Sequence, residues 1–79
     1  MTDAALHAEV ALVVRHVLRL PQGSEPIARE GTDAWDSLKH MEIVFALEDR
    51  YDIRFDEAEF DALDSVESIA AAVARHRAT

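Results

Sequence analysis

Ser37 and the residues near it in the sequence are of types that could take part in catalysis. It directly follows Asp36, and His40 stands three residues further along. A serine, a histidine and an acid are the residue types of a catalytic triad, in which the histidine activates the hydroxyl. We expect His40 to point into the core of a helical fold and not toward Ser37. The chain also has no Gly-x-Ser-x-Gly turn that would expose a nucleophile. We therefore expect no catalysis by this chain alone.

The histidines and acids do not form a metal-binding motif. The ligand spacings of zinc sites are missing among the four histidines, His7, His16, His40 and His76. A calcium loop starting at Asp49 would need glycine at its sixth position, where Arg54 stands. The chain has no cysteine, which excludes disulfides and suits a reducing compartment. We expect no bound metal and a cytoplasmic location.

The charge of the 79-residue chain is strongly acidic. Its formal net charge is −8, and residues 33–67 hold twelve acids but only three basic residues. Nucleic-acid binding through phosphates needs the opposite sign. The longest strongly apolar run, residues 10–14, is far too short to span a membrane. We expect no nucleic acid and no membrane association, but partners with basic surfaces.

The hydrophobic spacing predicts an all-α fold in one domain, residues 1–79. A first helix is expected from about Asp3, its N-cap, to Leu20, where Pro21 stops it. A long loop follows, with both prolines and both glycines of the chain and with Ile27 expected in the core. We expect a small four-helix bundle of three main helices and one short helix. The second and third main helices are expected at about 37–51 and about 66–77. The short helix is expected at about 56–63 and begins with a capping box formed by Asp56 and Glu59.

The helix expected at 37–51 has apolar residues on two sides. Ile43, Val44 and Leu47 fall on one side and suffice for a core face. A second apolar stripe lies roughly opposite, and the acids interleaved with it would be costly to bury. We therefore predict an exposed partner-binding surface that consists of Leu38, Met41, Glu42, Phe45, Glu48 and Asp49, with Lys39 pointing away from it.

The segment from Trp35 to Tyr51 resembles the acyl carrier proteins, in which Asp-Ser-Leu opens the second helix after a long loop. The resemblance continues to the start of the last helix and covers the whole domain. It implies that Ser37 carries a covalent 4′-phosphopantetheine arm, which a phosphopantetheinyl transferase attaches from coenzyme A, with Asp36 as the cap beside it. The arm would hold acyl intermediates as thioesters for acyl-loading, condensing and tailoring enzymes with basic docking patches. We expect a monomer.

Several residues distinguish this chain from typical members of that family. Trp35 stands where many fatty-acid carriers have a small residue, and Lys39 and Arg50 stand where acids are usual. These residues favour a stand-alone carrier of specialised, polyketide-like biosynthesis. Peptidyl carriers usually have two glycines shortly before the serine, where this chain has Ala34 and Trp35. A peptidyl or aminoacyl carrier and an unmodified acidic helical protein-interaction module remain as alternatives.

Overall fold

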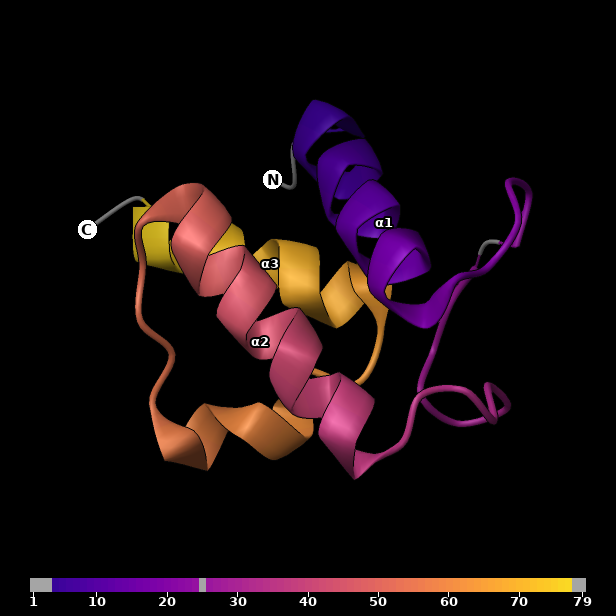
Figure 1. The fold of residues 1–79 in the computed structure, drawn as a ribbon. Coiled ribbons are helices and arrows are strands. Elements are labelled where there is room, and N and C mark those ends of the chain that lie inside the picture. Colours follow the sequence, from indigo (N-terminus) through magenta and orange to yellow (C-terminus); the bar gives the residue numbers. More distant parts are fainter. Residues whose placement is uncertain (1–3, 25, 78–79) are drawn as a thin grey trace.

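The computed structural model describes residues 4–24 and 26–77, and it is helical in the way the hydrophobic spacing predicts (Figure 1). In chain order the elements are the α-helix α1 (Ala4–Leu18), the α-helix α2 (Ser37–Tyr51), the short 3-10 helix η1 (Glu57–Ala62) and the α-helix α3 (Val66–Arg77). The described residues form no strand, and a single isolated bridge pairs Ala28 with Ser65. The predicted all-α class with three main helices and one short helix is confirmed. The expected cap Asp3 lies outside the described residues.

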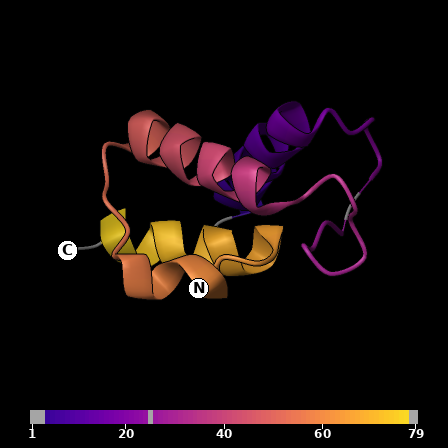
Figure 2. The same ribbon diagram turned by 60° about the horizontal axis from the view of Figure 1, so that its bottom comes forward.

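The core is built from one face of each main helix. α1 packs against both α2 and α3, and Figure 2 shows α2 lying above the layer formed by α3 and η1. The predicted inner face of α2, with Ile43, Val44 and Leu47, is completely buried. Burying an aliphatic side chain of this size stabilises the fold by roughly 1.5–3 kcal/mol. Among the described residues, no helix is long and apolar enough to cross a membrane.

α1 ends two residues earlier than expected because its C-terminal cap forms before Pro21. Arg19 adopts a left-handed conformation with φ 58°. The Leu20 N–H then donates to the Arg15 carbonyl at 2.9 Å, which closes the helix in a Schellman arrangement. Pro21 follows at once and cannot continue the helix.

The long loop between α1 and α2 is fastened to the start of α3. Ile27 is buried, as predicted, and its carbonyl accepts a hydrogen bond from the Val66 N–H at 3.0 Å. Two residues later the Arg29 N–H donates to the Asp64 carbonyl at 2.7 Å. The middle of the loop therefore has a fixed position close to the beginning of α2.

Candidate functional site

Ser37 is the first residue of α2, and its side chain is exposed. Asp36 precedes the helix in an extended conformation, and its Oδ1 accepts a hydrogen bond from the Lys39 N–H at 2.9 Å. The Asp36 carbonyl accepts the first helical hydrogen bond, from the His40 N–H at 2.8 Å. The predicted N-cap is therefore confirmed, and it leaves the Ser37 hydroxyl beside the positive end of the helix dipole.

Two buried side chains hold this helix start in place. Trp35 Nε1 donates to His40 Nδ1 at 2.9 Å, and both residues are buried. His40 Nδ1 therefore acts as an acceptor, which places the imidazole proton on Nε2, 2.8 Å from the Phe60 carbonyl oxygen of η1. This neutral tautomer satisfies both hydrogen bonds. The sequence predicted that His40 faces the core but did not indicate its partner Trp35, whose large ring directly before the helix cap was the available signal.

Ser37 differs from the other three serines, all of which the structure describes. It alone is exposed. Ser65 and Ser68 hydrogen-bond to each other at 3.1 Å, and Ser65 Oγ, directly before α3, also accepts from the Ser68 N–H at 3.0 Å. Ser24 donates to the Pro21 carbonyl within the loop. Ser37 is thus the serine most accessible to a modifying enzyme.

One contact of Ser37 was not foreseen. The Arg29 guanidinium Nη2 lies 3.4 Å from Ser37 Oγ and donates to it. Eight residues separate the two in sequence, and no spacing rule links a loop residue to a helix start at that distance. Only the fastening of the loop to α3 brings them together.

The outer face of α2 is exposed over most of the residues expected there. Leu38 and Phe45 are 70% and 57% exposed, which is unusual for large apolar side chains. Met41 is partly exposed, and Glu42 and Asp49 are exposed beside them. The geometry of these five residues agrees with the surface expected from the sequence.

The expectation for Glu48 is wrong, because this residue is only 8% exposed. Its Oε2 accepts a hydrogen bond from the buried Phe55 N–H at 2.9 Å, and its Oε1 lies 3.5 Å from Arg54 Nη1. The chain turns back at Asp52, where φ is 53°, and thereby returns Phe55 to the end of α2. Glu48 therefore fastens the link after α2 and does not belong to the exposed surface.

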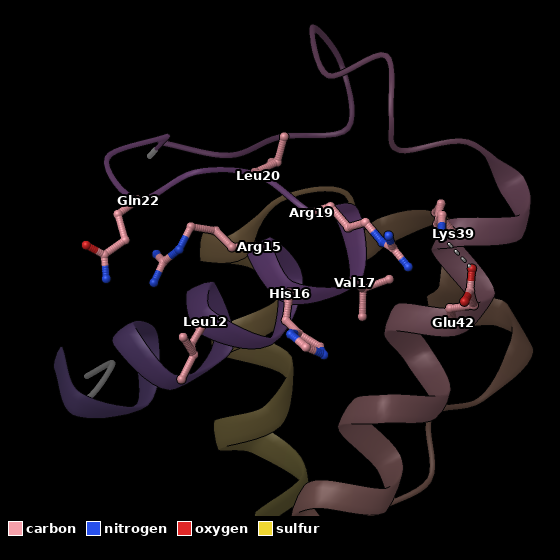
Figure 3. A pocket seen from close by; sticks show the side chains of 9 residues that line it. All are labelled: Leu12, Arg15, His16, Val17, Arg19, Leu20, Gln22, Lys39 and Glu42. Atoms are coloured by element: carbon pink, nitrogen blue, oxygen red, sulfur yellow. Dashed lines mark ion pairs between the residues drawn. The ribbon is translucent and has the colours of Figure 1, made fainter.

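Lys39 also departs from the expectation that it points away from this surface. Its Nζ lies 3.3 Å from Glu42 Oε2. The pair borders a groove of about 580 Å³ between the end of α1 and the start of α2, shown in Figure 3, where the Arg19 side chain extends toward Lys39. Arg15 and His16 line the same groove. The acidic side of α2 therefore meets a basic recess at Glu42.

Two carboxylate contacts outside this face are structural. Glu59 in η1 accepts hydrogen bonds from the Asp56 N–H at 2.9 Å and pairs with His76 Nε2 at 3.0 Å. The Asp56 N–H and then His76 hold the pKa of Glu59 below its ordinary value. Within residues 4–24 and 26–77, no group of three or more histidines and acids could hold a metal ion.

The structure therefore presents an exposed serine hydroxyl on a capped helix start within a small helical domain. In a comparison with known families, residues 35–73, about half of the chain, match the family described as phosphopantetheine attachment site. The chain belongs to this family and is a phosphopantetheine-carrying carrier protein, as its resemblance to the acyl carrier proteins implied. A comparison with curated proteins finds no match.

The residues at the start of α2 fit a phosphopantetheine group. Its phosphodiester is an anion, and a helix N-terminus favours an anion through its backbone N–H groups and its dipole. The exposed Ser37 hydroxyl is on that first turn. The chain itself has no thiol, so the reactive sulfur of a carrier would come from the arm.

Proposed function

We propose that Ser37 is the attachment residue and that the protein carries acyl intermediates on its arm between biosynthetic enzymes. The observation that carries this proposal is that Ser37 alone among the four serines is exposed, on the first turn of α2 and within the matched segment. On modification, Ser37 Oγ loses its proton and bonds to the phosphorus that bears the pantetheine arm, the pyrophosphate bond of coenzyme A breaks, and adenosine 3′,5′-bisphosphate leaves. The arm supplies a terminal thiol that holds acyl groups as thioesters.

Intact-mass measurement after incubation with coenzyme A and a broad-specificity phosphopantetheinyl transferase tests the attachment residue. The wild-type chain should gain the mass of one arm. Ser37→Ala should gain none, and Ser24→Ala, which removes a partly buried loop hydroxyl, should behave like wild type. If Ser37→Ala still gains one arm, another residue is the attachment site.

We further propose that the cargo is an acyl group of specialised, polyketide-like biosynthesis. Ala34 and Trp35 precede the site in place of the paired glycines usual in peptidyl carriers. The buried Trp35 ring is part of the support of the helix start, so this difference reaches the site itself. The modified protein should therefore be loaded by acyltransferases with a higher kcat/KM than by amino-acid-adenylating enzymes. The reverse order would favour a peptidyl or aminoacyl carrier.

We propose the exposed face of α2 as the docking surface for the transferase and for the loading, condensing and tailoring enzymes. Leu38, Met41 and Phe45 are the apolar anchors, and Glu42 and Asp49 provide charge for basic patches. A carrier must leave each partner, so we expect the interface to be small. The proposal omits Glu48, because its carboxylate is bonded to Phe55.

Truncating the anchors tests this surface. Phe45→Ala and Leu38→Ala should each lower kcat/KM for the transferase by about tenfold, because an anchor residue contributes more than about 1 kcal/mol. Glu67→Ala is the control, since Glu67 is exposed but lies on α3. Its kcat/KM should change less than about twofold. Equal effects at Glu67 and Phe45 would contradict the assignment of the α2 face.

A further inference from the structure

Arg29 is the single basic residue between Arg19 and Lys39. Its backbone is held on both sides, because its N–H donates to the Asp64 carbonyl at 2.7 Å and its carbonyl accepts from the Thr32 N–H at 3.2 Å. The side chain is partly buried and ends at Ser37 Oγ. The acidic chain thus places one guanidinium, on a fixed backbone, at the hydroxyl that we propose to be modified.

A neutral hydroxyl is a poor partner for this guanidinium. The distance of 3.4 Å from Nη2 to Oγ is longer than a typical N–H···O hydrogen bond. Once Oγ is esterified, the two non-bridging phosphodiester oxygens, which share one negative charge, lie two bonds beyond it. A guanidinium matches such oxygens in geometry and charge, and charge-assisted hydrogen bonds of this kind are the stronger ones.

The surrounding charge makes a cation at this position useful. Asp36 directly precedes the serine, and Asp33 and Glu30 stand in the same loop. All three carboxylates would repel a phosphodiester on Ser37. The start of α2 attracts the anion, and Arg29 is the side chain whose cation is in contact with the attachment oxygen.

We propose that Arg29 binds the phosphodiester of the arm on Ser37 and thereby holds the first bonds of the arm against the loop and the start of α2. The proposal rests on the proposed attachment at Ser37. Arg29 acts as a positioning residue: it binds the arm in the modified protein and takes no part in the chemistry at the thiol.

The test compares unmodified and modified protein for the wild type, Arg29→Gln and Arg29→Lys. At low salt, the change in Tm on modification should be about 3 °C more positive for the wild type than for Arg29→Gln, because only the wild type gains the ion pair between Arg29 and the phosphodiester. Arg29→Lys should keep part of this difference, since lysine retains the charge but not the forked geometry. Arg75→Gln removes the same charge in the last turn of α3, and its change in Tm on modification should equal that of the wild type. The difference should shrink in 1 M salt.

The ³¹P chemical shift of the modified protein provides a second readout. It should differ from the wild type in Arg29→Gln and stay unchanged in Arg75→Gln. An equal Tm change on modification in wild type and Arg29→Gln, together with an unchanged ³¹P shift, would overturn the role of Arg29. Intact mass of the wild type and of Ser37→Ala separates this failure from failure of the proposed function: an arm gained by Ser37→Ala, or no arm on the wild type, contradicts the attachment itself.

Discussion

Both ends of α2 are held by a buried polar side chain that bonds to the backbone of residues 53–60. At the start, His40 Nε2 donates to the Phe60 carbonyl at 2.8 Å, supported by Trp35 on its other nitrogen. At the end, the Glu48 carboxylate accepts from the Phe55 N–H at 2.9 Å. These two hydrogen bonds fasten the segment after α2 to both ends of the helix.

The two ends differ in what they leave on the surface. At the start, the buried pair leaves the Ser37 hydroxyl exposed. At the end, the polar groups are engaged in packing: besides Glu48, the Tyr51 hydroxyl donates to Glu9 of α1 at 2.9 Å, and burial raises the pKa of Tyr51. The start of α2 therefore exposes the hydroxyl that we propose to be modified, whereas the polar groups at its end are engaged in packing. Substitutions at the two ends should therefore have different effects.

The largest effect should come from removing the support of the helix start. Trp35→Ala should lower the free energy of unfolding by about 4 kcal/mol, because it leaves a cavity and removes the donor to His40. Trp35→Phe should cost about 1–2 kcal/mol, since the ring remains but His40 Nδ1 loses its partner. Urea unfolding followed by circular dichroism measures both. No loss in Trp35→Phe would show that the hydrogen bond to His40 contributes nothing, whereas equal losses for the two variants would show that the packing of the ring contributes nothing.

The stability of α2 should be sensitive to substitution of Glu48, near its end, and tolerant of substitution of Glu42 on its exposed face. Glu48→Ala should cost about 2 kcal/mol, because the buried Phe55 N–H is left without its acceptor. Glu42→Ala, on the exposed face, should change stability by less than about 0.5 kcal/mol. Transferase kinetics should show the opposite order at a temperature where both variants are folded. A stable Glu48→Ala with impaired docking would restore Glu48 to the partner surface.

The helical fold could be predicted because its determinants are local. Capping residues such as Asp36 and Ser65, and the apolar spacing through Ile43 and Leu47, act within a few residues of one another. The motif with Ser37 is equally local. Periodicity could not assign Glu48, because it places a side chain on a face of the helix but does not show which backbone group returns to that face.

Two contacts that the sequence did not indicate depend on distant segments. Arg29 reaches Ser37 only because the loop is paired with the start of α3. His40, which bonds locally to Trp35, also meets a carbonyl twenty residues away. Such contacts follow from tertiary packing, and no rule of short-range spacing encodes them.

Acid should destabilise η1, whose Phe60 carbonyl accepts the hydrogen bond from His40, because Glu59 becomes protonated. The pKa of Glu59 is lowered in the folded state, chiefly by the Asp56 N–H and then by His76. A lowered pKa stabilises the fold above the unfolded value near 4.5, and this contribution disappears as the pH falls through the folded value. Glu59→Gln should therefore cost about 0.5–1 kcal/mol at pH 7, a size limited by partial exposure. The wild-type advantage in thermal melts should decrease as the pH falls below 4.5; an advantage that does not change with pH would contradict the role of the ionised carboxylate.

The smallest effect should come from the backbone, and it should have opposite signs at the two ends of α2. Asp52 ends the helix with φ 53°, a conformation that glycine adopts without steric cost, and its N–H donates to the Glu48 carbonyl. Asp52→Gly should raise stability by about 0.5 kcal/mol, a Tm increase of about 3 °C. Asp52→Ala removes the same charge without the freedom of glycine and should not be stabilising. Asp36→Gly, at the start, should cost a few tenths of a kcal/mol, because the side-chain bond to the Lys39 N–H is lost. Thermal melts of the three variants make the comparison, and an equal gain in Asp52→Ala and Asp52→Gly would assign the effect to charge instead of backbone strain.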